Sequence, residues 1–119
     1  MRFLSMIRIE ENTGQVPSDQ LMSDMGKLIE ELTRTGQLVS TAGLRPTSEG
    51  VRVRLRRGKL SVVDGPFAET KEVIGGYAIL EAKSKDEAIE LTRRFLKVHG
   101  DDWDIECELR QLDGPEFGR

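Results

Sequence analysis

The chain has 119 residues, of which 37% are hydrophobic and 33% are charged, a composition typical of one globular domain rather than of a membrane protein or a disordered chain. No apolar run approaches the roughly 20 residues that cross a bilayer. The 18 basic and 21 acidic side chains give a net charge of −3, which argues against nucleic acid as a partner. The N-terminal stretch has no signal-peptide pattern and Cys107 has no second cysteine to pair with, so we expect a cytoplasmic protein.

The first third of the chain predicts a strand, a helix and a second strand. Arg2–Ile9 carries apolar residues at both alternating sets of positions, which indicates a strand covered on both faces. Ser18 is a suitable N-cap for the helix predicted over Gln20–Thr35, and Gly36 is a typical helix stop. Gln37–Ala42 predicts a short strand.

The middle of the chain predicts a β-hairpin. Apolar and basic residues alternate over Val51–Arg57, Gly58 provides a turn, and Lys59–Val63 returns. The alternation predicts that the arginines share one solvated face of the hairpin, namely Arg52, Arg54 and Arg56.

The last part of the chain predicts a strand, a helix and a strand. Val73–Ala82 is predicted as a strand with a bulge at its Gly75-Gly76 pair. Ser84–Glu87 has the pattern of a capping box at the start of a helix, and Gly100 is predicted to end that helix. Trp103–Gln111 alternates in the way that a final strand does.

This order of elements predicts an α+β fold, a ferredoxin-like sandwich with an inserted β-hairpin. Residues 1–112 are expected to form a single domain, followed by a polar C-terminal tail over residues 113–119. Two helices can cover only one face of the sheet, whereas the first strand is apolar on both faces. The simplest cover for the other face is a second copy of the chain, so we expect a homodimer.

One segment resembles a known family signature. Residues Asp64–Glu72 read DGPFAETKE and are followed by Ile74–Tyr77; this run resembles the signature of the YCII-related family, DGPF subfamily. The segment Gly43–Pro46 and the stretch from Phe95 to Gln111 are also similar to members of that group. The resemblance implies a dimeric α+β barrel with a pocket between two sheets. It also implies a regulatory alternative, because many members are encoded beside extracytoplasmic-function sigma factors.

Enzymatic relatives in the wider YCII group use a His–Asp pair whose histidine lies early in the first helix. The predicted first helix contains no histidine, and the single histidine of the chain is His99. The resemblance therefore carries no His–Asp pair onto the first helix of this chain.

Asp64 is the first candidate site residue. An aspartate in a turn usually accepts a hydrogen bond from the backbone N–H two residues on, but Pro66 has no N–H. Its carboxylate must accept from the Phe67 N–H, from Thr70, from Lys71, from a ligand or from a partner chain. The alternative is a purely structural turn between two strands.

Four further residues complete the candidate site. Phe67, Thr70 and Lys71 are predicted ligand-binding residues, where the hydroxyl and the ammonium suit an anion; a salt-bridged loop is the alternative. His99 is predicted, with Asp64, to be an acid–base group. The helix dipole alone also explains a histidine at a helix C-terminus.

No metal site or cofactor is expected, because one His and one Cys supply no transition-metal ligand set and no phosphate-binding glycine loop occurs. The arginine row lacks interleaved aromatic residues, and its pairing with the acidic row on the last strand, within or between subunits, would use the charges without nucleic acid. That acidic row consists of Asp104, Glu106 and Glu108.

We therefore expect the protein to bind a small molecule near the Asp64–Lys71 loop, with Asp64 as the base. An anion is a candidate for this molecule. The alternative is a non-enzymatic protein that acts through protein–protein contacts.

Overall fold

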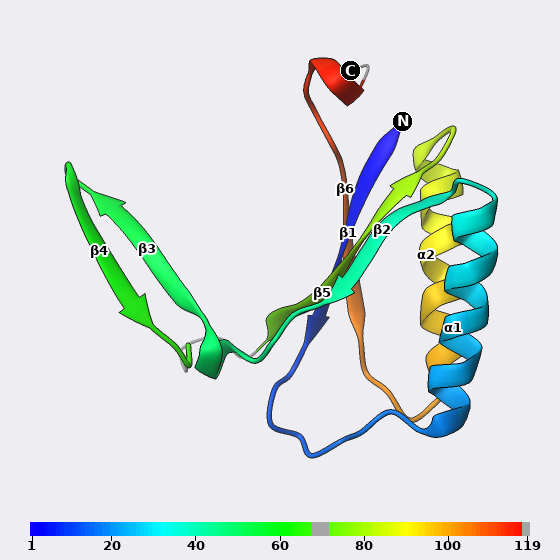
Figure 1. Ribbon diagram of the computed structural model, residues 1–119, viewed down its shortest axis with the longest axis horizontal. Coiled ribbons are helices and arrows are strands. Elements are labelled where there is room, and N and C mark those ends of the chain that lie inside the picture. The colour runs from blue at the N-terminus through cyan, green and yellow to red at the C-terminus, as the bar shows by residue number, and fades with distance from the viewer. Residues whose placement is uncertain (68–71, 118–119) are drawn as a thin grey trace.

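The computed structural model describes residues 1–67 and 72–117, and it forms a two-layer sandwich from which a hairpin projects (Figure 1). Short 3-10 turns lie at Thr47–Glu49 and Pro115–Phe117. The helices and strands are, in chain order, β1 (Arg2–Ile9), α1 (Asp19–Arg34), β2 (Leu38–Gly43), β3 (Val51–Arg56), β4 (Lys59–Asp64), β5 (Val73–Glu81), α2 (Lys85–His99) and β6 (Glu106–Gln111).

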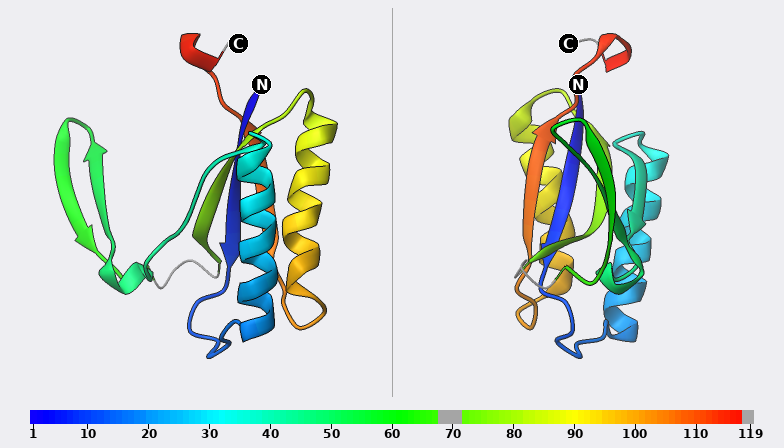
Figure 2. Two further views of the ribbon diagram at one scale, coloured as in Figure 1. Left: turned by 45° about the vertical axis from the view of Figure 1, so that its right-hand side comes forward. Right: turned by 90° about the vertical axis from the view of Figure 1, so that its left-hand side faces the viewer.

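The main sheet is antiparallel, with the strand order β2-β5-β1-β6. Both helices cover the same face of this sheet, and the hairpin lies on the opposite side (Figures 1 and 2). The predicted α+β class with a ferredoxin-like arrangement is therefore confirmed. Within the described residues, no helix is long and apolar enough to span a membrane.

The core lies between the sheet and the two helices. Phe3, Leu32 and Leu80 are its largest fully buried side chains. They belong to β1, α1 and β5, so the core joins the two layers. Because alternate residues of a strand point to opposite faces, Leu4 and Met6 of β1 point to the face that the helices leave uncovered.

Both helices begin and end where the sequence indicates. The Ser18 hydroxyl accepts a hydrogen bond of 3.0 Å from the Leu21 N–H, and the Ser84 hydroxyl accepts one of 3.1 Å from the Glu87 N–H. Gly100 follows α2 with a φ of 77°, a conformation that glycine adopts without strain. These contacts satisfy backbone groups that each helix end would otherwise leave without a partner.

The predicted bulge is confirmed in β5. The register against β1 shifts between Ile7 and Arg8, which leaves Gly75 as the extra residue. A Cβ atom on Gly75 would lie 2.4 Å from the Ile9 Cδ1 atom. Glycine therefore allows the bulged backbone to approach the side chain of Ile9.

The hairpin β3–β4 is also confirmed, but its faces differ from the prediction. Arg52 and Arg54 are half-buried, whereas the opposite, apolar face is largely exposed. The apolar face is exposed because the hairpin projects from the sandwich, away from the main sheet (Figure 1). Arg52 is half-buried because it packs on the Phe67 ring. The radius of gyration is 16.3 Å, whereas a compact chain of this length would have about 13.5 Å.

The last strand is shorter than predicted, because β6 begins at Glu106 and not at Trp103. Its acidic side chains face Arg8 of β1, at 3.8 Å for Glu106 and 3.6 Å for Glu108. Within the described part of one chain these carboxylates therefore pair with Arg8. Pairing of the acidic and arginine rows between two subunits stays a prediction.

Candidate functional site

The loop after β4 is fixed by its backbone. The Gly65 N–H donates a 2.9 Å hydrogen bond to the Gly50 carbonyl. A Cβ atom built on Gly65 would lie only 1.7 Å from the Thr47 carbonyl oxygen. The glycine of the DGPF run is thus required by close packing of two backbone segments, while the adjacent Asp64 side chain is exposed.

Phe67 contacts a cation of its own chain. The Arg52 guanidinium carbon lies 3.8 Å from the centroid of the Phe67 ring, a stacked cation–π geometry. Phe67 is also half-buried. It therefore closes the base of the hairpin. Thr70 and Lys71, the other two predicted ligand-binding residues, lie outside the described residues.

Glu11 joins this hairpin base to the sandwich. Its carboxylate accepts hydrogen bonds of 2.8 Å from the Thr47 N–H and of 2.6 Å from the Thr47 hydroxyl. These two bonds, the side-chain bond first, lower the pKa of Glu11 from its ordinary value of 4.5. Glu11 was not predicted from the sequence, because it lies 36 positions from Thr47 and no local pattern joins the two residues.

A cavity of about 350 Å³ lies between the main sheet and the two helices; we call it the interlayer cavity. Its lining is mostly apolar, and it contains no Asp, Glu, Lys or Arg among the described residues. The lining residues are Ser5, Ile7, Met25, Ile29, Thr41, Ala42, Gly43, Gly75, Gly76, Ala78, Phe95, Leu96, His99, Ile105 and Cys107.

His99 supplies an imidazole to the interlayer cavity. Its Nδ1 atom lies 2.9 Å from the Phe95 carbonyl oxygen, which can only accept, so Nδ1 carries the hydrogen. In the neutral ring, Nε2 is then a hydrogen-bond acceptor. The ring also meets Trp103 edge-on, with the centroids 5.9 Å apart and the planes at 68°. Two contacts therefore fix the orientation of the imidazole.

Ser5 and Cys107 add two further polar groups on neighbouring strands. Ser5 is buried and Cys107 is half-buried, and they interact through a hydrogen bond. Burial raises the pKa of the Cys107 thiol above its ordinary value of 9.0, an effect that the Ser5 bond partly offsets. Neither residue was among the site residues predicted from the sequence. The available signal was a serine at a core-facing position of an otherwise apolar strand.

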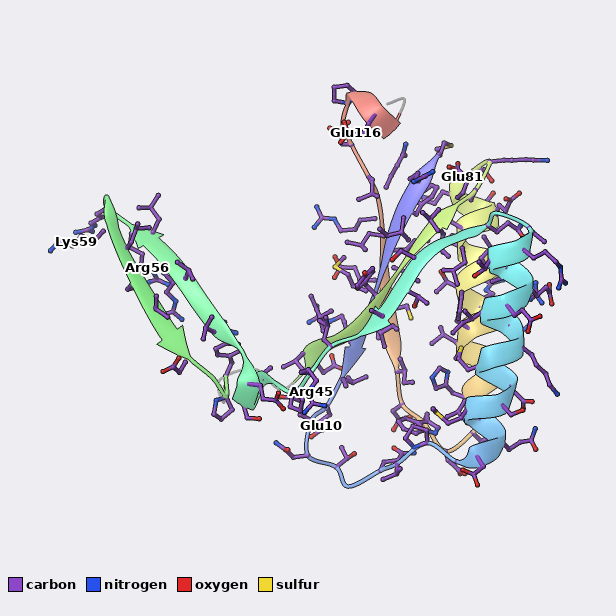
Figure 3. All side chains as sticks on the ribbon, viewed as in Figure 1. Glu10, Arg45, Arg56, Lys59, Glu81 and Glu116 are labelled. Carbon is purple, nitrogen blue, oxygen red and sulfur yellow. The ribbon has the colours of Figure 1, made fainter. Side chains whose placement is uncertain are left out.

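A second cavity, also of about 350 Å³, lies near the base of the hairpin. Carboxylates dominate its charged lining, and Arg45 is the cation among its described lining residues. Figure 3 shows Glu10 and Arg45 in this region. The charged residues of the lining are Glu10, Glu11, Arg45, Asp102 and Asp104.

The structure does not place the two predicted acid–base residues together at either cavity. His99 lines the interlayer cavity, whereas Asp64 is not among the lining residues of either one. In the described part of the chain, no group of three or more His, Cys, Asp or Glu residues is arranged to hold a metal ion.

The antiparallel sheet, the two helices on one face and the cavity between these layers define an α+β domain of the ferredoxin-like type. Residues 1–98 match the YCII-related domain, and the chain belongs to this family. The match ends one residue before His99, so the imidazole and the Cys107 thiol lie beyond it.

One curated relative is the uncharacterized protein R00369 of Rhizobium meliloti (strain 1021). It is 35% identical to this chain over 75 residues. The aligned segment covers 63% of this chain and 60% of the relative, so the chain spans about three-fifths of the length of the relative that it matches.

Proposed function

We propose that this chain binds a small, uncharged and largely apolar molecule in the interlayer cavity, with His99 as the group that hydrogen-bonds to it. The observation that carries this proposal is the lining, which is mostly apolar and includes four polar side chains on different elements: Ser5, Thr41, His99 and Cys107. Cavities of this size, with few polar groups on apolar walls, are typical of small-molecule sites.

The lining favours an uncharged ligand over the anion suggested by the sequence. The described lining of the interlayer cavity has no cation that could offset the cost of removing an anion from water. The acidic lining of the second cavity would repel an anion.

The proposal assigns acid–base chemistry to His99. An imidazole whose Nδ1–H is held by a carbonyl presents Nε2 as a proton acceptor. The acid–base role of Asp64 stays a prediction. Because Asp64 does not line the interlayer cavity, we expect Asp64→Asn to leave binding there unchanged.

The finer assignment to the DGPF subfamily is also proposed, on the run Asp64–Glu72. The described part of this run supports a structural role for its glycine, since Gly65 packs directly on Thr47. With this assignment we propose a homodimer whose uncovered sheet faces pack on each other. The apolar residues of that face, Leu4 and Met6 among them, support such packing.

Binding is tested by thermal unfolding with three probes of similar size: 4-methylphenol, toluene and benzoate. We expect the two uncharged probes to raise the melting temperature and benzoate to have no effect. We also expect 4-methylphenol to slow the alkylation of Cys107 by iodoacetamide, because the thiol lines the same cavity. A protein that responds to benzoate alone, or to none of the three, would contradict the proposal.

Two tryptophan variants of α1 localise the site. Met25 lines the interlayer cavity, so Met25→Trp should fill it and abolish the response to both uncharged probes. Met22 lies on the same helix but is 62% exposed, and Met22→Trp serves as the matched control that should retain the response. Equal thermal responses to the uncharged probes in both variants would place the binding site outside the interlayer cavity.

His99→Phe tests the polar contact. The change keeps a ring of similar volume and removes both nitrogens. We expect the affinity for 4-methylphenol to fall by about threefold to tenfold, the scale of one lost hydrogen bond. The affinity for toluene should stay within twofold of the wild type.

A second candidate function is a regulatory role through contacts with another protein, such as a sigma factor. The observation that favours it is the exposed apolar face of the hairpin. This role requires that the face remain accessible when the protein is assembled in solution. Measurement of the oligomeric state and of its dependence on the hairpin decides between these uses.

A further inference from the structure

The hairpin has two chemically different faces. Residues that pair directly across two antiparallel strands point to the same side, and Val53 pairs with Val62 while Leu55 pairs with Leu60. Together with Val51 they form what we call the hairpin apolar face. Its exposed fractions run from 55% for Val51 to 75% for Leu60.

The opposite face of the hairpin is mostly polar, with Val63, opposite Arg52, as its apolar member. Arg54 pairs with Ser61, and Arg56 pairs with Lys59. Figure 3 shows Arg56 and Lys59 near the outer end of the hairpin, far from the sandwich. An antiparallel ribbon with one apolar and one charged side typically packs its apolar side against protein and leaves its charged side in water.

The main sheet has an uncovered face on the same side of the molecule as the hairpin (Figures 1 and 2). Its centre is formed by two directly opposed pairs, Leu4 with Ile79 and Met6 with Tyr77. The helices lie on the other face of the sheet. On the β6 side this apolar strip is bordered by Arg110, opposite Leu4, and by Glu108, opposite Met6. One side of the chain therefore presents two separate apolar surfaces, a strip at the centre of the sheet and the hairpin apolar face.

The available area indicates how these surfaces are used. A fully buried Val or Leu side chain removes roughly 60–120 Å² of apolar surface from water. Five such side chains at the observed exposure then supply about 200–400 Å². A stable protein interface needs about 800 Å² from each partner, so the hairpin face is too small to hold a partner alone.

We propose that the hairpin is an intersubunit arm, whose apolar face packs on a second copy of this chain and extends the interface formed by the uncovered sheet face. This inference rests on the face-to-face dimer proposed above. In a two-fold dimer every contact is made twice, so one arm from each chain and both sheet faces act together. A second copy is the occupant because it uses both apolar surfaces on this side at once.

The test uses single charges placed on either face of the hairpin. Val53→Asp and Leu60→Asp introduce a carboxylate on the apolar face, and Ser61→Asp introduces the same group on the polar face as the matched control. Sedimentation equilibrium should give 26.8 kDa for the wild type, twice the chain mass of 13.4 kDa. We expect the apolar-face variants to raise the dimer dissociation constant at least tenfold and the control to leave it within twofold.

Folding of each variant is checked by far-UV circular dichroism. Val53→Ser and Leu60→Ser provide milder versions of the same change, with the same direction expected. To confirm contact between chains, a photo-cross-linking residue at position 62 should join two chains in the wild type, and the same residue at position 61 should do so much less.

The outcomes separate the arm from the dimer. A wild type that is monomeric at 100 µM would overturn both. A dimer whose dissociation constant is the same in all variants would overturn the arm and leave the sheet-to-sheet dimer in place. Binding of the wild type to phosphatidylcholine vesicles that is lost in Val53→Asp would assign the apolar face to lipid and would overturn the arm.

Discussion

At the scale of single residues, glycine and glutamate at the hairpin base have roles that side-chain type alone does not reveal. Gly65 is needed because the carbonyl oxygen of Thr47 occupies the space that a Cβ would fill. Glu11 is needed because its carboxylate accepts both hydrogen bonds that Thr47 offers. Both residues act on Thr47, so the short turn at Thr47–Glu49 connects the loop after β4 to the loop after β1.

Gly65→Ala should destabilise the protein by about 1–3 kcal/mol, because the added methyl group forces two backbone segments apart. Gly26→Ala is the control, since a Cβ at Gly26 meets nothing within 4 Å. In a helix this control should stabilise by about 0.5–1 kcal/mol. Urea unfolding measures both. Equal effects of the two substitutions would contradict the close approach at Thr47.

The lowered pKa of Glu11 makes a pH-dependent contribution to stability. A carboxyl group whose pKa is lower in the folded state stabilises the fold above its ordinary pKa, 4.5 here, and that contribution is lost as the pH falls through the lowered pKa. Glu11→Gln and Thr47→Val should each reduce the acid-side slope of stability below about pH 4.5.

At the scale of elements, local patterns predicted the helices and strands closely. β1 has the predicted bounds, the two serine N-caps make their expected bonds, and β5 contains the predicted bulge. These features depend on residues a few positions apart, or on one neighbouring strand, and sequence spacing describes them well.

Features that depend on distant contacts were predicted less well. The exposure of the hairpin apolar face depends on the hairpin projecting away from the sheet, and alternation in the sequence only separates the two faces. The interlayer cavity gathers residues from six elements, so His99 could be proposed from its chemistry whereas Ser5 and Cys107 could not be placed beside it. The pairing of Arg8 with the acidic residues of β6 likewise depends on strand order.

The N-cap of α1 gives a test at this scale. Ser18→Ala removes the 3.0 Å bond to the Leu21 N–H and should cost about 0.5–2 kcal/mol of stability. Ser23→Ala, at an exposed position inside the same helix, is the control and should be neutral or slightly stabilising, because alanine has the higher helix propensity. Denaturant unfolding measures the stability of both variants. A larger loss of stability in Ser23→Ala than in Ser18→Ala would contradict the role of Ser18 as the N-cap.

At the scale of the whole molecule, the chain combines a packed sandwich with an extended ribbon. β1 lies between two other strands, and its helix-facing side contributes Phe3 to the core. β3 and β4 form a separate two-stranded sheet. The two parts should therefore differ in local stability, because little buried surface protects the hairpin.

Hydrogen exchange tests this difference. We expect the amides of β1 and β5 to exchange only through global unfolding, and those of β3 and β4 to exchange at least a hundredfold faster in the dilute protein. Raising the protein concentration into the dimeric range should slow exchange in the hairpin and leave the core unchanged. Uniform protection of all six strands at low concentration would contradict the division into two parts.

The hairpin and the main sheet also differ in the length of chain that separates their paired residues. Leu55 and Leu60 pair across five positions, whereas Phe3 and Gln111 pair across 108. Contacts between near neighbours form sooner, because a short loop loses less entropy on closing. During synthesis, which proceeds from the N-terminus, the hairpin can therefore form while β6 is still missing from the edge of the main sheet.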